Sequence, residues 1–211
     1  MFDTAIELRS YRAASEDRAA VVPLPGGGGV VIVVADGVGG RRGGTRAAER
    51  AVDVVAGAAP AVARPRQPGA WRDLLFEADR AIRLDPDAGE TTAVVAAVTD
   101  RGVAGAAVGD SEAWVVEPGR AVPLTSGGGR KPYLGHGMAV PVAFGAASPD
   151  GTLLVATDGL FKCVNVTRFA AAARTADLAE AARAVAELPR NSAGSFYDDV
   201  AVVLCRRVAK T

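Results

Sequence analysis

The sequence is poor in the residues on which several kinds of functional site depend. Its 211 residues include one histidine, His136, and two cysteines, Cys163 and Cys205. A histidine-based zinc site and a catalytic triad are therefore disfavoured, and the two cysteines do not have metal-ligand spacing. Such sparse cysteine usage is typical of a reduced setting, so we expect a cytoplasmic protein. A metal ion, if one is bound, has to be held by oxygen atoms.

The sequence also has no excess of positive or negative charge and no long apolar run. The 24 basic residues balance the 24 acidic ones, so there is no electrostatic argument for nucleic acid or an anionic membrane as partner. No apolar run approaches the roughly 20 residues that cross a bilayer. The first residues, MFDTAIELRSYR, lack the apolar stretch of a secretory signal. Without a linker or an internal repeat, we expect one domain over 1–211.

What the sequence does contain is a series of short apolar strands and two groups of helices. We expect strands at 5–9, 18–24, 30–35, 92–98, 103–108, 112–116, 152–157 and 200–205, and helices at 45–59, at 71–82 and, as a pair, within 166–188. Tight turns between residues 92 and 116 predict an antiparallel meander. The glycine-rich segment 126–148 is expected to be a loop. Strands in runs and helices in pairs predict an α+β fold of two antiparallel sheets, each flanked by a helix pair.

Aspartates stand where several of these strands end or begin. They are Asp36, Asp110, Asp158 and Asp198. Asp36 and Asp158 share one pattern, an apolar run that leads into Asp-Gly. Carboxylates gathered at one sheet edge would raise each other's pKa unless a divalent cation neutralised them. Because carboxylate and carbonyl oxygens suit magnesium and manganese, the pattern favours an oxygen-ligated Mg²⁺ or Mn²⁺ site.

Other interpretations fit the same residues. Asp-Gly is a common turn signal, so each aspartate taken alone is better explained as a turn residue, and only the set favours ligands. The glycine-rich segment 37–44 could instead cradle a phosphate at a helix N-terminus, although neither GxGxxG nor GxxxxGK[ST] is present. Arg12 alone is explained as a solvated surface residue, and His136 as incidental to function.

Five motifs follow one another between residues 9 and 205. They are RAASED at 12–17, ADGVGGRRGGTRAA at 35–48, GETT at 89–92 with VGDSEAW at 108–114, ATDGL at 156–160 and YDDVAVV at 197–203. In this order they resemble the elements R..NED, ADGMGGH..GE.AS, GTT with GDSRAY, SDGL and DN.TVV of the type 2C metal-dependent Ser/Thr protein phosphatases, the PPM family. The chain is similar to a compact bacterial member with a shortened flap, because only a glycine-rich stretch lies between 124 and 152.

The resemblance implies an α-β-β-α sandwich with two metal ions at the sheet edge. One further residue of this chain matches a residue that the family uses for a third ion. By motif position, Asp36 would bridge two ions, and the carbonyl of Gly37 would bind one of them. Asp158 and Asp198 would hold the other ion. The ions implied are Mg²⁺ or Mn²⁺.

Four further residues receive implied roles from the same motifs. Glu16 would contact the metal site through water, and Asp17 would order that network. Asp110 matches a residue that the family uses for a third ion, and Arg12 matches the arginine that grips the substrate phosphate. Three residues beside these positions depart from the motifs: Ser15 replaces Asn, Arg41 replaces His and Asp199 replaces Asn.

The activity implied is hydrolysis of phosphoserine and phosphothreonine by a water molecule that the ions activate, with Arg12, Asp36 and Asp158 in catalytic roles. The expected partner is a phosphorylated protein, the product of a Ser/Thr kinase, and the enzyme is expected to be a monomer. The alternatives are a phosphatase of small metabolites and a non-catalytic phosphate-binding module on the same fold.

Overall fold

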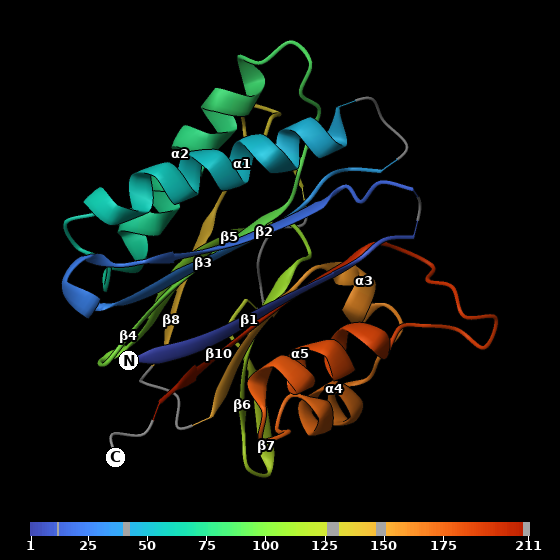
Figure 1. Cartoon of the computed structure of the whole chain (residues 1–211). Coiled ribbons are helices and arrows are strands. Elements are labelled where there is room, and N and C mark those ends of the chain that lie inside the picture. Colours follow the sequence, from blue (N-terminus) through green and yellow to red (C-terminus); the bar gives the residue numbers. More distant parts are fainter. Residues whose placement is uncertain (12, 40–42, 126–130, 147–150, 209–211) are drawn as a thin grey trace.

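Two antiparallel sheets lie face to face in the computed structural model of the chain, which describes residues 1–11, 13–39, 43–125, 131–146 and 151–208. Within these residues, the first sheet has the order β1 (Phe2–Arg9), β10 (Val200–Arg207), β9 (Thr152–Ala156), β6 (Glu112–Glu117) and β7 (Arg120–Pro123). The second has the order β2 (Asp17–Pro23), β3 (Gly29–Asp36), β4 (Ala93–Thr99), β5 (Gly102–Val108) and β8 (Val142–Ala146). The two sheets form the inner layers of a sandwich (Figure 1).

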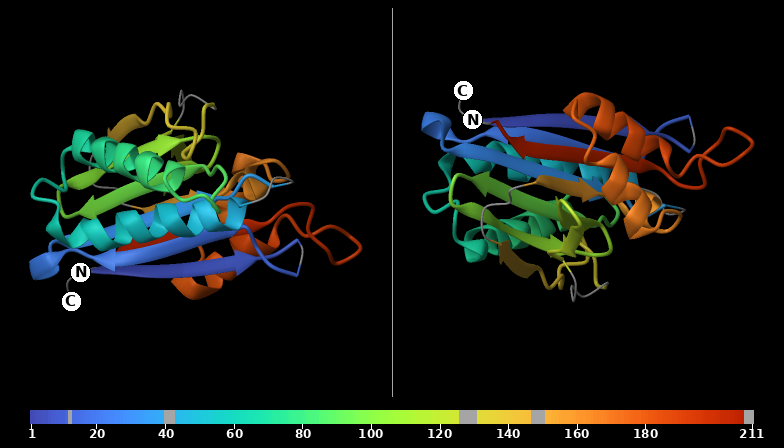
Figure 2. Two further views of the ribbon diagram at one scale, coloured as in Figure 1. Left: turned by 90° about the horizontal axis from the view of Figure 1, so that it is seen from above. Right: turned by 90° about the horizontal axis from the view of Figure 1, so that it is seen from below.

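Helices form the two outer layers. Helices α1 (Gly44–Ala58) and α2 (Pro68–Arg83) cover the sheet that contains β3, and α3 (Asp158–Phe161), α4 (Val166–Ala172) and α5 (Leu178–Glu187) lie on the other sheet. Figure 2 shows the two helix layers from opposite sides. Short 3-10 turns span Pro25–Gly27 and Ala59–Ala61. The predicted α+β sandwich is confirmed. None of the helices in the described ranges combines the length and apolarity needed to span a bilayer.

The continuous apolar run of β3 follows from its place in a middle layer. Val31, Val33 and Ala35 pack toward α1 and α2, whereas Ile32 and Val34 pack toward the opposite sheet. Side chains alternate between the faces of a strand, so a strand that is covered on both faces is apolar at every position. The strand is therefore buried from Val31 to Ala35, directly before Asp36, its last residue.

Two sequence-based expectations about strands are wrong. The meander is interrupted after β5, because β6 pairs with β7 and β9 in the other sheet. The turn signal at Gly109-Asp110 therefore marks a crossing between sheets. Within 126–148, the expected loop includes β8, which pairs with β5. β8 was not recognisable because it is an edge strand in which only Phe144 is buried.

The segment 131–139 is anchored to α2 by one buried carboxylate. Asp79 is 5% exposed, and its Oδ1 accepts hydrogen bonds from the backbone N–H groups of Gly135 at 2.7 Å and Gly137 at 3.0 Å. Its Oδ2 accepts from the N–H of Ala139 at 3.3 Å. A buried carboxylate needs such partners, so the three bonds hold this segment against α2.

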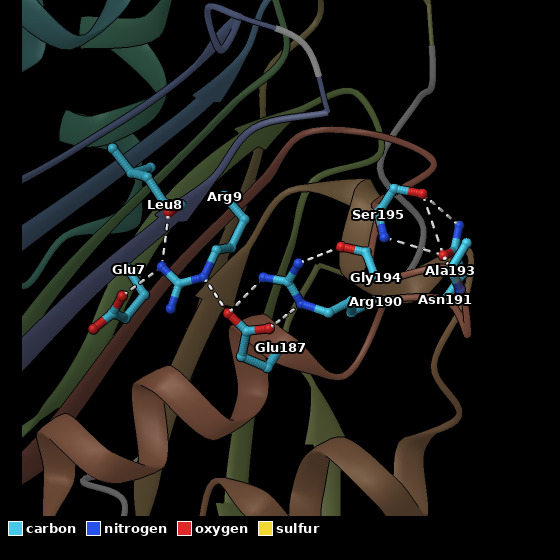
Figure 3. A network of polar contacts seen from close by, with 9 residues as sticks. All are labelled: Glu7, Leu8, Arg9, Glu187, Arg190, Asn191, Ala193, Gly194 and Ser195. Carbon is cyan, nitrogen blue, oxygen red and sulfur yellow. Dashed lines mark hydrogen bonds and ion pairs between the residues drawn. The ribbon is translucent and has the colours of Figure 1, made fainter.

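A polar network joins the end of β1 to the chain that leads into β10 (Figure 3). Glu187 accepts from Arg9 at 2.6 Å and from Arg190 at 2.5 Å. Arg190 also lies over the ring of Phe196, 4.5 Å from its centroid. Asn191 Oδ1 accepts from the N–H of Ala193 and of Ser195, which closes the turn between 191 and 195. The network thereby orders the approach to residues 198 and 199.

The anchor predicts that Asp79→Asn lowers the free energy of unfolding by about 1–3 kcal/mol, because the amide keeps one acceptor oxygen and loses the charge. Urea unfolding measures the change. Asp73→Asn is the matched control, since its side chain lies on the same helix but is 66% exposed. Equal stability of the two variants would contradict the anchoring role of Asp79.

Candidate metal centre

A polar pocket of about 350 Å³ is lined by residues at the end of β3 and at the start of α3. Its lining, as far as the chain is described, is Glu16, Asp36, Gly37, Val38, Gly39, Thr92, Asp110, Tyr133, Asp158, Lys162, Asp198 and Asp199. Six of the predicted site residues, Glu16, Asp36, Gly37, Asp110, Asp158 and Asp198, therefore share one pocket. Asp17 lies beneath it, and Arg12 lies outside the described residues.

The pairing of β2 with β3 places two carboxylates side by side. Asp17 and Asp36 are opposite each other in the antiparallel register. Asp17 is 1% exposed, and its Oδ2 accepts a 2.7 Å hydrogen bond from Thr157 Oγ1. Thr157 Oγ1 in turn accepts from the N–H of Ala201 at 2.9 Å. Asp17 therefore connects the two sheets beneath the pocket.

The backbone around Asp36 is held by the GETT segment. The N–H of Asp36 donates to Thr92 Oγ1 at 3.2 Å, and its carbonyl accepts from Thr91 Oγ1 at 2.8 Å and from the N–H of Thr92 at 2.9 Å. One residue further, the N–H of Val38 donates to the carbonyl of Glu90 at 2.9 Å. The strand end that carries Asp36 is thus fixed on the side facing β4.

The glycine after each Asp-Gly aspartate permits a close backbone approach. A Cβ at Gly37 would lie 2.4 Å from the carbonyl carbon and oxygen of Gly44, at the start of α1. A Cβ at Gly159 would lie 1.9 Å from the carbonyl oxygen of Asp199. Real Cβ atoms do not tolerate such distances, so each aspartate owes its position to the glycine that follows it.

Asp158 and Asp198 are joined through Lys162. Asp158 is the first residue of α3, is 8% exposed, and lies one helical turn before Lys162. Lys162 Nζ lies 2.8 Å from Asp158 Oδ2 and 2.7 Å from Asp198 Oδ2. Lys162 lies outside the motifs from which the site was predicted. The i, i+4 spacing from Asp158 on a helix is the signal that could have found it.

Asp199 is a second residue whose importance the sequence analysis did not predict. Its Oδ1 accepts from the N–H of Tyr11 at 2.7 Å, and its Oδ2 accepts from the N–H of Glu16 at 2.6 Å. A single side chain therefore bridges both ends of the segment 11–16, which connects β1 and β2. Its place beside Asp198 in the YDDV motif was visible, but its partners lie more than 180 residues away in sequence.

The electrostatics of the pocket follow from burial and from like charges. Burial, together with the neighbouring carboxylates, raises the pKa of Asp36 to about 9 from an ordinary value of 3.8. Burial raises the pKa of Asp17 to about 7, although the hydrogen bond from Thr157 opposes the shift. Burial also raises the pKa of Asp158, against the opposing effect of Lys162. The folded chain therefore favours either protons or a cation in this pocket.

The chemistry of the donor set fits a divalent cation. Asp17 Oδ1 and Asp158 Oδ1 are buried and have no hydrogen-bond partner among the described residues. Carboxylate oxygens, with the carbonyl of Gly37 beside them, are the ligand type that Mg²⁺ and Mn²⁺ prefer. The acidic groups line one pocket, but no three Asp, Glu, His or Cys side chains in the described ranges surround a common point closely enough to form a metal site by themselves. Lys162 Nζ takes the place between two of them.

Solved structures share this fold over almost their whole length. A bacterial serine phosphatase has a TM-score of 0.86 at 16% identity, with 100% of both chains covered. The Ser/Thr phosphatase Stp1 from Staphylococcus aureus has a TM-score of 0.82 at 18% identity, with 99% of this chain and 96% of that chain covered. The catalytic domain of the serine/threonine protein phosphatase PstP, in complex with two manganese ions, has a TM-score of 0.79 at 20% identity, with coverages of 99% and 100%. At such identities the likeness establishes the fold.

Sequence comparison supplies the family. A search of curated proteins finds no significant match. A family model described as Protein phosphatase 2C matches residues 12–136, which is more than half of the chain and includes the motifs around Asp36 and Asp110. The expected enzyme class, a protein serine/threonine phosphatase, is thereby confirmed. The chain belongs to the protein phosphatase 2C family.

Proposed function

We propose that the chain is a metal-dependent phosphatase that hydrolyses phosphoserine and phosphothreonine in proteins, with Mg²⁺ or Mn²⁺ held in the carboxylate pocket. The observation that supports this most is the set of carboxylates with raised pKa around one pocket, two of which keep a buried oxygen without a partner. Such a set is costly without a cation, because like charges in a desolvated site repel each other.

The proposed ligands come from separate elements that meet at the pocket. The Asp36, Asp158 and Asp198 carboxylates and the carbonyl of Gly37 would hold the divalent ions. Glu16, Asp17 and Asp110 are the proposed outer or third-ion residues. Bound divalent ions would lower the pKa of a coordinated water molecule and neutralise charge on the phosphoryl group.

The residues of the chain orient this chemistry. Thr157 holds the Asp17 carboxylate, and Thr91 and Thr92 hold the backbone of Asp36, so neither carboxylate has to reorganise when a phosphoryl group enters. Asp199 fixes both ends of the segment 11–16 that carries Glu16 and Arg12. We propose that Arg12 grips the phosphate, since a guanidinium can donate two parallel hydrogen bonds to it.

A second hollow beside the pocket favours a polypeptide substrate over a small metabolite. This adjoining hollow of about 590 Å³ is lined by Val38, Glu90, Lys131, Pro132, Tyr133, His136 and Met138. It shares Val38 and Tyr133 with the carboxylate pocket. Residues on either side of a phosphorylated serine or threonine would have room there, whereas a free metabolite would leave it unused. A protein phosphorylated by a Ser/Thr kinase is the substrate that this arrangement suits.

The proposal also covers the domain count, the oligomeric state and the cellular location of the protein. The described elements form one set of layers with both helix layers packed on the same pair of sheets, which supports a single domain over 1–211. Cys163 and Cys205 are both free thiols, and we propose a monomer in the cytoplasm.

The metal-dependent mechanism predicts that Asp158→Asn lowers kcat on a phosphothreonine peptide by roughly hundredfold or more in saturating Mn²⁺. The reason is that a metal ion stabilises the transition state by several kcal/mol. EDTA should abolish the activity of the wild type. Phosphate release is the measurement, and Asp100→Asn, in the distant turn between β4 and β5, is the control with the same chemical change.

Two results would count against this proposal. Full activity of the wild type in EDTA would remove the metal from the mechanism. Absence of phosphate release by folded wild type that binds Mn²⁺ would favour a non-catalytic phosphate-binding module, and faster hydrolysis of free phosphorylated metabolites than of the peptide would favour the small-molecule alternative.

Metal removal should also expose the charge repulsion around Asp36. Its folded-state pKa is about 9 and its ordinary value is 3.8, so between these values the folded chain binds more protons than the unfolded chain. The free energy of unfolding therefore falls as pH rises through this window. In EDTA, Asp36→Asn should gain stability relative to the wild type from pH 5 to pH 9, because the amide does not titrate.

Urea unfolding at pH 5, 7 and 9 tests this, with Asp100→Asn again as the control. Saturating Mn²⁺ at pH 8 should stabilise the wild type more than Asp36→Asn, because the ion binds only the folded state. Parallel pH profiles of the free energy of unfolding for the wild type and Asp36→Asn would show that ionisation of Asp36 does not destabilise the metal-free fold.

A further inference from the structure

Lys162 is a cation within the set of acidic side chains that line the pocket. Its ammonium group lies 2.8 Å from Asp158 Oδ2 and 2.7 Å from Asp198 Oδ2, close to ideal distances for charge-assisted hydrogen bonds. It is the one basic side chain among the described residues that line this pocket. The sequence motifs do not explain it, because it follows ATDGL by two residues and matches none of the quoted elements.

Three of the four carboxylate oxygens of Asp158 and Asp198 already have a partner. Both Oδ2 atoms are used by Lys162, and Asp198 Oδ1 accepts a hydrogen bond from the N–H of Asp199 at 3.0 Å. Of these four carboxylate oxygens, only Asp158 Oδ1 is buried and without a partner among the described residues. A divalent ion that used both carboxylates would therefore find one oxygen free and would compete with the ammonium group, or with the N–H of Asp199, for the others.

We infer that Lys162 is a built-in competitor of the divalent ion: its ammonium group neutralises the Asp158–Asp198 pair in the metal-free protein and must give up these oxygens when an ion binds there. This inference rests on the proposed function, because it concerns the same pocket. It adds a residue that sets how tightly the pair takes up an ion.

The side chain has the properties that such a competitor needs. It is 54% exposed, and a lysine has a flexible stem of four carbons, so the ammonium group can move into water when it is displaced. The free energy of breaking its two hydrogen bonds is subtracted from the binding of the ion. The same contacts remove like-charge repulsion when no ion is present, and therefore support the metal-free fold.

The test is a calorimetric titration of metal-free protein with Mn²⁺, which measures binding without any substrate. Lys162→Met should lower the Kd of an ion by about tenfold or more, since each hydrogen bond to a charged group is worth about a factor of ten or more. Arg168→Met is the matched control: it removes one positive charge from the next helix, at an exposed position outside the pocket, and should bind Mn²⁺ like the wild type. In EDTA, Lys162→Met should also have a lower Tm than Arg168→Met.

Two further variants assign the effect to this contact. Lys162→Arg retains a cation and should keep a Kd close to that of the wild type. Lys162→Met combined with Asp198→Asn should lose the gain in affinity, because one of the contested carboxylates is gone. If the metal-free Lys162→Met does not fold, Lys162→Gln, which keeps a donor without a charge, is titrated in its place, and the same tighter binding is expected.

The outcomes separate failure of this inference from failure of the proposed function. Equal Kd values for the wild type, Lys162→Met and Arg168→Met would overturn the role of Lys162 and leave the metal-dependent phosphatase in place. Absence of Mn²⁺ binding in the wild type and in every variant would overturn the proposed function itself, and this inference with it. Weaker binding in Lys162→Met would show that the lysine assists the ion, which is the opposite of the role inferred here.

Discussion

Repulsion between carboxylates is the constraint to which the rest of this structure is adapted. The end of β3, the segment before β10, the start of α3 and the segment before β2 each bring an aspartate or glutamate to one pocket. Burial makes this arrangement costly, and the raised pKa of Asp36 is the consequence. A fold that maintains such a cluster must supply a compensating charge. In the metal-free chain Lys162 supplies part of it, and the proposed divalent ions would supply the remainder.

The sandwich is suited to this task because its middle layers are rigid and its strand ends are precise in position. Strands covered on both faces cannot shift without opening two cores, so Asp17 at the start of β2 and Asp36 at the end of β3 remain opposite each other. Threonine hydroxyl groups add hydrogen bonds at this edge: those of Thr157 and Thr91 donate to the Asp17 carboxylate and the Asp36 carbonyl, and that of Thr92 accepts from the N–H of Asp36. The layers place the carboxylates, and these short polar contacts orient them.

Much of this could be predicted from the sequence, because the decisive features are local patterns. The apolar runs that end in Asp-Gly predicted both the buried strands and the acidic edge, and Gly37 and Gly159 do provide close approach of the backbone. Features that depend on distant partners could not be predicted. The turn at Asp110 has the same local signal whether the chain folds back or crosses to the other sheet. Asp199 and Lys162 acquire their roles from groups that only the fold brings near.

The central claim is that the acidic pocket at the end of β3 binds the metal ions of a phosphatase. Diffraction from crystals soaked in Mn²⁺, collected at the manganese absorption edge, tests it most directly because anomalous scattering locates the ions themselves. We expect peaks beside the Asp36 carboxylate, near the carbonyl of Gly37 and near Asp158, with Lys162 moved away from any ion bound between Asp158 and Asp198. Manganese sites elsewhere on the molecule, with no peak in this pocket, would contradict it.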